Sequence, residues 1–523
     1  MLSATALNKI ARSKNGAVRC NEKDRSTLMI FKKGVVDLSN RLASWSTEEE
    51  DCCSWAGIQC DNVTGRVTKL DLHIDHAYNY DTLEEETFLR GEINLSLLQL
   101  EFLNYLDLSN NLFDLVSIPP PANFSDLRYL DLSLNYLVMD NLDWLSRLPS
   151  LEYLDLSNIY LENETDWLIS MASLASLSEL RLRSCRLRNV SSSLNFVNFT
   201  SLAILDLSYN EFFKSKFPIW LFNLSRRISS VDLSGNQFEG EIPIAFLKLQ
   251  NLKSLNLNHN RLNGTIPDWE SGEGNMLAYL DLSNNLLSGA LPDCWGKWKQ
   301  LAVLYMGSNK LTGEIPASMG TLSNLNRLDL HNNNFFGEFS LDLSKWRDME
   351  LINLENNKFS GSLPSTMPVD LFRMNLRSNQ FTGNIPLQIC NLRSLMILDL
   401  AENMLSGVIP RCIYNITAMA SRPIHSIPQE TINVTAKGQE REYKDDWLKE
   451  YDDPNVAEER NEEDDPFLKS LYLGMGLGFA VGFWGVCGSL FFIRAWRHRF
   501  FRIYYGVVDQ VYVAVALKFK SFE

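Results

Sequence analysis

The sequence predicts an α/β repeat solenoid of short parallel strands, with a disulfide-stabilised N-terminal cap and one transmembrane helix near the C-terminus. Three observations support this fold class. A motif of leucine and asparagine recurs along the middle of the chain, mostly in steps of 24 residues. Four cysteines lie within residues 20–60, ahead of the first copy of the motif. Residues 470–493 contain no charged side chain and are followed directly by arginines.

Composition narrows the functional classes. The 523-residue chain has a formal net charge of −15, which argues against a nucleic-acid-binding protein. It contains 47 asparagines. So many would be unusual in an enzyme core, because a buried amide is costly unless it is hydrogen-bonded. We therefore expect asparagine to perform one structural task repeatedly.

The repeat motif is visible in "LNYLDLSNNLF", "LAYLDLSNNLLSGALP" and "LMILDLAENMLSGVIP". Together with a less regular first copy, "VTKLDLHID", we count 14 units, which match the leucine-rich-repeat pattern. The leucines of LxxLxL alternate along a short strand and point into the coil. Successive strands should stack into a parallel sheet on the concave face, because a single coil cannot bury its leucines alone.

The asparagine of the motif should turn its amide inward and hydrogen-bond the backbone of neighbouring loops. Ile159 and Cys185 occupy its place in two coils and should interrupt this ladder. From the seventh repeat onward, most units add GxIP or a close variant, such as GEIP, GTIP or GALP.

The N-terminal segment "DRSTLMIFKKGVVDLSNRLASWSTEEEDCCSWAGIQCD" contains a helical stretch, a Trp, a Cys pair and WxGxxC. With the GxIP extension, it resembles plant receptor-like proteins, which are cell-surface leucine-rich-repeat receptors without a kinase domain, and in particular the receptors of the fungal xylanase elicitor type. The resemblance covers about residues 20–520 and implies disulfides Cys20–Cys52 and Cys53–Cys60. Such a cap would cover the exposed apolar edge of the first coil. Disulfides favour an oxidising compartment, and the alternative is four reduced thiols in a cytosolic protein.

Two further cysteines, Cys390 and Cys412, lie 22 residues apart, which is about one coil. Stacked coils are ~4.8 Å apart, and a disulfide requires Cα atoms at roughly 4.4–6.8 Å. We therefore expect a bridge between adjacent coils. Cys185 and Cys294 have no evident mate.

Asn-x-Ser/Thr sequons favour a secreted, glycosylated ectodomain when taken together with the cap cysteines, although each alone is a weak signal. They occur at Asn62, Asn94, Asn123, Asn163, Asn189, Asn198, Asn223, Asn263, Asn415 and Asn433.

We expect the following organisation. An atypical N-terminus without a clear signal peptide (1–19) precedes the cysteine cap (20–65) and the repeats (66–412). Residues 413–443 resemble a fragment of the non-repeat island of these receptors, and 444–469 form an acidic linker. Residues 470–493 would be about 36 Å long as a helix, enough for a ~30 Å bilayer core. The arginines that follow place the short tail, 494–523, in the cytoplasm. The alternative is a buried helix of a soluble protein.

Gly474, Gly478 and Gly482 form a GxxxGxxxG stripe on the expected transmembrane helix. Small residues let two helix backbones approach each other in lipid. The resemblance implies an adaptor receptor-like kinase as the partner of this face. The alternative is that a transmembrane helix simply tolerates glycine.

The ligand surface is expected on the concave strands, where Tyr105, Tyr129 and Tyr153 occupy equivalent places and should form a ladder. Tyr279 and Tyr305 are expected to repeat it. Tyrosine and arginine are favoured at binding hot spots. Basic points on the same face are Arg181, Arg183, Arg327, Arg373 and Arg377. The expected ligand is an extracellular protein or peptide.

Enzyme motifs such as HExxH, GxSxG or a kinase signature do not occur, so we expect no catalytic residue, metal or cofactor. His73 and His76 could share a metal, but a surface loop explains them equally well. The resemblance implies a defence receptor that signals through a partner kinase. Two alternatives stay open. One is an extracellular inhibitor of the polygalacturonase-inhibiting type. The other is a non-signalling truncated decoy, because the family's last repeats and C-terminal cysteine cap are not recognisable.

Overall fold

The computed structural model describes residues 19–46, 51–74, 87–117, 126–190, 197–224, 226–268, 276–420, 432–436 and 439–443. All of them belong to one compact unit within Met1–Lys449. The expected transmembrane helix, its glycine stripe, the acidic linker and the cytoplasmic tail lie outside the described residues. Within the described ranges, no helix is sufficiently long and apolar to cross a bilayer.

The N-terminal cap begins with α1 (Glu22–Gly34), which packs against the first coil. Asn21 is its N-cap and accepts a hydrogen bond from the Lys23 amide, and acids in the first turn and lysines in the last oppose the helix dipole. The short strand β1 (Val35–Val36) then pairs antiparallel with β4 (Arg90–Asn94). A 3₁₀-helix, η1 (Cys52–Ser54), leads into β2 (Ile58–Cys60), which pairs antiparallel with β3 (Val67–Asp71).

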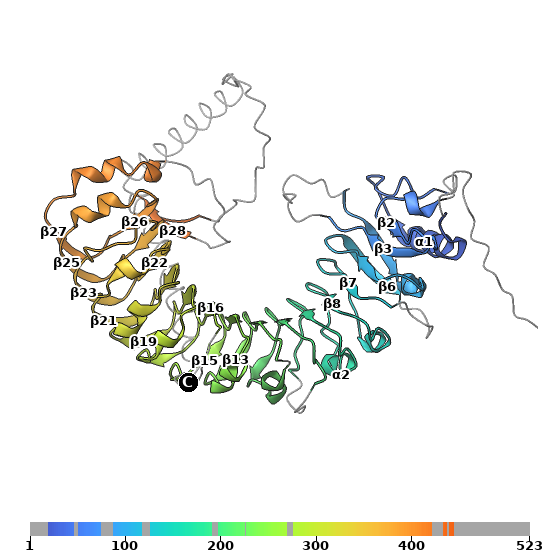
Figure 1. Ribbon diagram of the computed structural model, residues 1–523, viewed down its shortest axis with the longest axis horizontal. Helices are drawn as coiled ribbons and strands as arrows, with labels where there is room; N and C mark the ends of the chain where they lie inside the picture. Colours follow the sequence, from blue (N-terminus) through green and yellow to red (C-terminus); the bar gives the residue numbers. More distant parts are fainter. Residues whose placement is uncertain are drawn as a thin grey trace, which may run out of the picture. The chain divides into compact units, whose positions relative to one another are not determined.

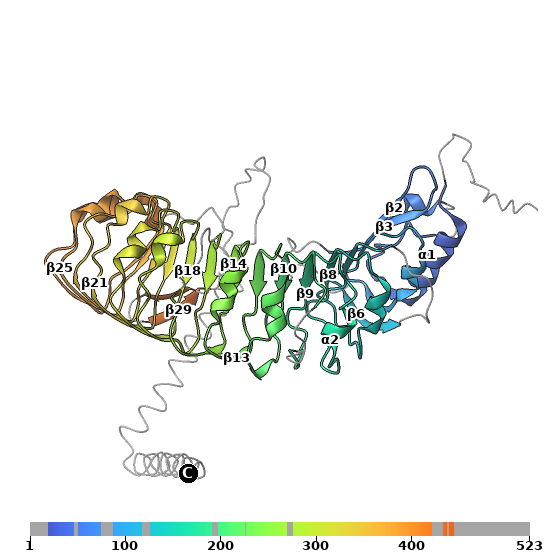
Figure 2. The same cartoon turned by 60° about the horizontal axis from the view of Figure 1, so that its bottom comes forward.

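A 15-stranded sheet runs through the repeats, and every strand pair after β2–β3 is parallel. It lines the inner side of the coils (Figure 1), and its strands lie side by side in Figure 2. We number the coils from β3 as coil 1 to the last strand as coil 14. Their strands are β5 (Tyr105–Asp107), β7 (Tyr129–Asp131), β8 (Tyr153–Asp155), β9 (Glu179–Arg181), β10 (Ile204–Asp206), β12 (Ser230–Asp232), β14 (Ser254–Asn256), β16 (Tyr279–Asp281), β18 (Val303–Tyr305), β20 (Arg327–Asp329), β22 (Leu351–Asn353), β24 (Arg373–Asn375) and β26 (Ile397–Asp399).

The opposite side of the coils carries short helices that close the core over the leucines. Leu106, Leu130 and Leu154, the central residues of three successive strands, are fully buried. The only α-helix on this side among the described residues is α2 (Trp167–Ser170). The rest are 3₁₀-helices: η3 (Leu95–Gln99), η4 (Asp143–Arg147), η5 (Ile219–Asn223), η6 (Ile244–Lys248), η7 (Trp295–Lys297), η8 (Ala317–Thr321), η9 (Leu343–Lys345), η10 (Leu387–Asn391), η11 (Arg411–Asn415) and η12 (Thr417–Ala420).

The GxIP extensions build a second, parallel sheet that the sequence motif alone did not predict. Its six strands are β17 (Ser288–Gly289), β19 (Lys310–Gly313), β21 (Asn334–Glu338), β23 (Lys358–Ser362), β25 (Gln380–Asn384) and β27 (Met404–Ser406). Gly337 shows why glycine recurs there. Its φ is +84°, and a Cβ would lie 2.8 Å from Cγ of Glu314. In the described parts of the earlier coils, this side carries two shorter sheets. One consists of β11 (Phe213–Ser215), β13 (Gln237–Gly240) and β15 (Arg261–Leu262), and the other of β1, β4 and β6 (Leu112–Ser117).

The asparagine ladder forms as the sequence predicts. The Asn285 amide donates to the carbonyls of Leu257, Leu282 and Ser283 at 3.0–3.1 Å, and its Oδ1 accepts the Leu262 N–H at 3.0 Å. Both expected interruptions are present. Ile159 is fully buried and has no side-chain amide, and Cys185 Sγ lies 3.1 Å from the Leu156 carbonyl oxygen. Beyond the coils, β28 (Ile432–Ala436) and β29 (Gln439–Tyr443) pair antiparallel.

Candidate ligand-binding face

Three tyrosines on the inner sheet form a continuous aromatic ladder. Tyr105, Tyr129 and Tyr153 lie opposite one another in the registers of β5, β7 and β8. The ring centroids of successive tyrosines are 4.1 and 4.2 Å apart, with interplanar angles of 8° and 6°. Each side chain is half-buried. The ladder is therefore a rigid aromatic surface whose outer edges remain accessible.

Charged groups close both ends of the ladder. Lys69 Nζ lies 4.1 Å from the ring centroid of Tyr105 and 2.9 Å from a carboxylate oxygen of Asp71. At the other end, Glu179 lies opposite Tyr153 and accepts a hydrogen bond from Arg181 Nε at 2.6 Å. The exposed faces of the outermost rings are thus bordered by ion pairs.

A column of aspartates runs beside the tyrosines on the same strands. Asp107, Asp131 and Asp155 pair in register and are almost fully buried. Burial, assisted by the charges of Asp155 and Asp107 and opposed by hydrogen bonds from Ser133, raises the pKa of Asp131 to about 7. Burial also raises the pKa of Asp155. Asp131, in the middle of the column, therefore becomes charged near neutral pH.

The second expected tyrosine pair does not repeat the ladder, so that prediction was wrong. In the register of β16 and β18, Tyr279 lies opposite Val303, whereas Tyr305 lies opposite Asp281. The two rings are 6.1 Å apart and nearly perpendicular, at 79°. The cause is positional, because "VLY" places its tyrosine in the aspartate column while "YLD" places it in the ladder column.

The arginines of the face are engaged in different ways. Arg181 occupies the aspartate column opposite Asp155 and Asp206. The guanidinium carbon of Arg183 lies 4.2 Å from the ring centroid of Tyr209, and its Nη1 donates to Ser208 Oγ at 3.0 Å.

Farther along the face, Arg327 pairs with Glu350 at 3.3 Å, and Arg377 contacts Glu402 and lies 3.8 Å from Asp399. Arg373 is 8% exposed. The arginines thus lie on the expected face. Arg181 and Arg183, in coil 5, lie near the end of the tyrosine ladder, whereas the other three lie in coils 11 and 13.

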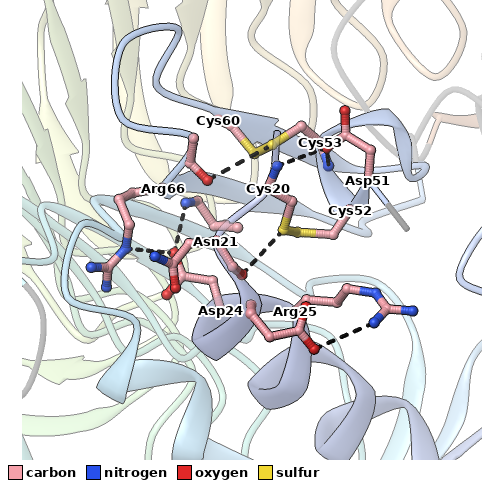
Figure 3. The surroundings of a disulfide bond; sticks show 12 residues. Cys20, Asn21, Asp24, Arg25, Asp51, Cys52, Cys53, Cys60 and Arg66 are labelled. Atoms are coloured by element: carbon pink, nitrogen blue, oxygen red, sulfur yellow. Dashed lines mark hydrogen bonds and ion pairs between the residues drawn. A yellow bond between two sulfur atoms is a disulfide. The ribbon is translucent and has the colours of Figure 1, made fainter. Parts of the chain in front are cut away.

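The cap adjoining the first coil contains two disulfides, Cys20–Cys52 and Cys53–Cys60, with Cα separations of 5.3 and 5.5 Å (Figure 3). Cys390–Cys412 joins the last coils with a Cα separation of 5.6 Å. These are the pairs that the family resemblance and the coil spacing led us to expect. Cys185 and Cys294 are both buried, and burial raises the pKa of the Cys185 thiol.

Most sequon asparagines are accessible. Those with exposed side chains are Asn62, Asn163, Asn189, Asn198, Asn223, Asn263 and Asn415. Asn94 is half-buried and accepts the Ser96 N–H at 2.9 Å as the N-cap of η3. Asn433 lies on β28, and Asn123 falls outside the described residues.

A cluster of possible metal ligands occurs at coil 1. Ligand atoms of Asp71, His73 and Asp107 lie within 4.8 Å of one another. However, Asp71 already pairs with Lys69 at 2.9 Å and with His73 Nδ1 at 2.5 Å. Because a lysine ammonium neutralises this carboxylate, we assign no metal to the cluster. His76 lies outside the described residues.

Comparison with known sequences agrees with this architecture. Residues 21–61 match the family described as leucine-rich-repeat N-terminal domain, and 101–159, 275–335, 227–249 and 251–272 match leucine-rich-repeat families. The chain is 35% identical to the receptor-like protein EIX1 and 42% identical to EIX2, both from Solanum lycopersicum. These matches cover 46% and 54% of this chain but only 26% and 30% of the relatives. Both relatives are named as receptor-like proteins, which agrees with the expectation that this chain is not an enzyme.

Two solved ectodomains are similar in fold. The plant peptide hormone receptor RGFR1, in complex with RGF2, is 25% identical, with 70% of this chain and 63% of that chain covered and a TM-score of 0.50. The Arabidopsis receptor kinase HAESA, in complex with the peptide hormone IDA and the co-receptor SERK1, is 26% identical, with 76% of each chain covered and a TM-score of 0.50.

Proposed function

We propose, from its relationship to plant leucine-rich-repeat receptor-like proteins, that this chain is the extracellular sensor of a defence receptor at the plasma membrane. Its inner sheet would bind an extracellular protein or peptide, and a partner receptor kinase would carry the signal. The relationship extends over about half of the chain. The likeness to two peptide-receptor ectodomains supports a ligand of this class.

The observation that carries the proposal is the tyrosine ladder at the inner side of the repeats. Tyr105, Tyr129 and Tyr153 are held by stacking at about the van der Waals distance and have little freedom to lose when a ligand binds. Binding costs side-chain entropy whenever flexible groups become ordered. Rigid aromatic side chains with a polar edge therefore lose little conformational entropy when they contact a ligand.

The aspartate column beside the ladder adds a chemical preference. Asp107, Asp131 and Asp155 follow the tyrosines strand by strand. Complementary charge steers association and fixes register more than it adds affinity. A ligand segment carrying lysine or arginine would thus suit this part of the face.

We further propose that residues 470–493 span the membrane once, with the repeats outside. The length of this uncharged segment and the arginines that follow it support this topology. It also favours a membrane receptor over a soluble enzyme inhibitor. The stripe of Gly474, Gly478 and Gly482 would let the helix of an adaptor receptor-like kinase approach closely.

The test is a triple substitution of Gly474, Gly478 and Gly482 to Leu in the full-length chain, produced with a secretory signal in plant cells. Leucines add bulk along the stripe without lowering hydrophobicity, so insertion should persist while kinase association is lost. The readouts are surface labelling, a glycosidase-dependent mass shift and co-precipitation of the adaptor kinase. The matched control changes Leu477, Val481 and Phe492 to Ile. Normal kinase association of a surface-labelled triple Gly→Leu protein would contradict the pairing.

A further inference from the structure

A hollow of 290 Å³ opens between Phe88, which precedes β4, and the loops that directly follow strands β5, β7, β8 and β9. Ten described residues line it, and none of these is Asp, Glu, Lys or Arg. This contrasts with the adjoining sheet face, where Asp and Arg recur. Among the described residues, the lining of the hollow is therefore uncharged, although the protein as a whole is strongly acidic.

Several lining side chains have hydrogen-bonding groups that the fold does not use. The amide of Asn135 is consumed by three backbone carbonyls, of Leu108, Leu132 and Ser133. By contrast, the side chains of Asn158 and Ser184, which hold equivalent places one coil apart, make no hydrogen bond to another residue of the described ranges. Both are half-exposed. They present an amide and a hydroxyl to whatever fills the hollow.

Two tyrosines form aromatic walls. Tyr136 is 59% exposed, and Tyr160 lies one repeat later, 24 residues along the chain. Arg186 covers one face of Tyr160, with its guanidinium carbon 4.3 Å from the ring centroid. Arg186 thereby fixes the ring without lining the hollow itself.

The hollow coincides with the interruption of the asparagine ladder. At Phe113 the backbone N–H donates to Asn135 Oδ1, but the next ladder position is Ile159. There the loops are joined by a backbone bridge between Val138 and Tyr160. At the interruption, a backbone bridge therefore joins the neighbouring loops in place of the asparagine hydrogen bonds. The side-chain amide of Asn158 lies beside this bridge and lines the hollow.

One lining residue also adopts an unfavourable backbone conformation. Leu134 has φ +53°, at a position where the neighbouring coils have Asn110 and Asn158. Left-handed conformation is tolerated by Asn and Gly and disfavoured for a bulky side chain. The equivalent residue is left-handed in most other coils as well, for example at Tyr209 and Glu402, so coil closure sets the conformation. Leu134 is the bulky aliphatic residue at this position, and its side chain lines the hollow.

We propose that this hollow binds one neutral sugar unit of an oligosaccharide. An uncharged lining gives no partner to an acidic or basic ligand, whose desolvation would be uncompensated. The volume of 290 Å³ lies just below the range of roughly 300–1,000 Å³ for ligand pockets, which suits a single ring better than a peptide segment. Tyrosine faces can cover the apolar C–H face of a sugar ring, while amide and hydroxyl groups bond its hydroxyls. The site is independent of the protein or peptide ligand proposed for the tyrosine ladder.

The test is saturation-transfer difference NMR on the purified full-length protein, deglycosylated beforehand so that its own glycans give no signal. The probes are oligosaccharides of glucose, xylose, galactose, mannose and N-acetylglucosamine, with an oligogalacturonide as the acidic comparison. At least one neutral oligosaccharide should give a signal. That signal should fall more than fivefold in Tyr136→Ala, which removes an aromatic wall.

Asn158→Gly keeps the left-handed backbone and removes only the amide, so it should weaken the same signal. Val138→Ala is the matched control, because Val138 is 54% exposed, lies two residues from Tyr136 and does not line the hollow. Its signal should stay within twofold of the unmodified protein. The proposal is overturned if none of the neutral probes binds, if the oligogalacturonide binds equally well, or if the signal survives both Tyr136→Ala and Asn158→Gly in folded protein.

Discussion

Coils 2–5 and coils 9–13 share one repeat motif but differ in their asparagine ladder, in their second sheet and in the residues on their inner face. In the later coils the asparagine ladder is unbroken, and the glycine-containing strands add a second parallel sheet. In the earlier coils, Ile159 and Cys185 replace the ladder asparagine, and stacked tyrosines occupy the inner face. The difference indicates that the regular coils are fastened by the asparagine ladder and the second sheet, whereas the earlier coils, under the proposed function, would provide the surface for recognition.

The largest effect is expected when the ladder position is changed in each region. Asn285→Ala should destabilise the regular coils by roughly 2–6 kcal/mol, because the buried Leu262 N–H and the Leu257 carbonyl lose their partner at ~1–3 kcal/mol each. Cys185→Ala at the same position of coil 5 removes only weak thiol contacts to the Leu156 and Arg183 carbonyls and should cost less than about 2 kcal/mol. Urea unfolding midpoints compare the two. Equal losses would contradict the difference between the regions.

A pH-dependent effect is expected in the earlier coils. The pKa of Asp131 is raised to about 7, above ~3.9 for an unfolded chain, so the folded state holds the proton more tightly. Stability should therefore fall as pH rises from about 4 to about 7, by an amount on the order of 1–3 kcal/mol. Asp131→Asn should remove part of this decline. Thermal unfolding across this range measures it, and an unchanged slope in Asp131→Asn would show that other groups cause the decline.

A smaller effect is expected in the second sheet. Gly337→Ala forces a Cβ into a left-handed residue and against Glu314, and should cost about 1–2 kcal/mol. Gly320→Ala is the matched control, because its Cβ would lie 3.6 Å from Leu341 Cδ2, which is ordinary contact. Unfolding midpoints should drop for Gly337→Ala alone. A comparable drop in both variants would mean that the left-handed conformation is not the cause.

Much of the fold could be predicted from the sequence because the motif is periodic. The spacing of Asn111, Asn135 and their successors gives the coil period, and Ile159 and Cys185 are visible as substitutions in the repeat. Tyr305 shows where this reasoning fails. A residue's column is set by its position relative to the central leucine of the strand. Tyr305 follows that leucine and lies in the aspartate column, but the prediction compared residue types alone and placed it in the tyrosine column.

The hollow could not be found from the sequence. Its lining residues come from five coils, and most of them converge because loops after successive strands share a left-handed residue, as at Asn110 and Leu134. That conformation is fixed by coil closure. The second sheet could not be predicted either. The GxIP motif resembles a turn, and the strand with which each of these segments pairs lies one coil away.

The most direct test of the proposed division between recognising and supporting coils is site-specific photo-crosslinking of the full-length protein, produced with a secretory signal at the plant cell surface. A photoreactive phenylalanine analogue replaces either Tyr129, in the ladder, or Leu351, in the same side-chain column of coil 12. Cells are exposed to fungal culture filtrate and irradiated, and adducts are measured by mass. We expect a filtrate-dependent adduct at position 129, competed by excess filtrate, and none at position 351. An adduct at position 351 without one at 129, with both receptors at the surface, would contradict the assignment of recognition to the earlier coils.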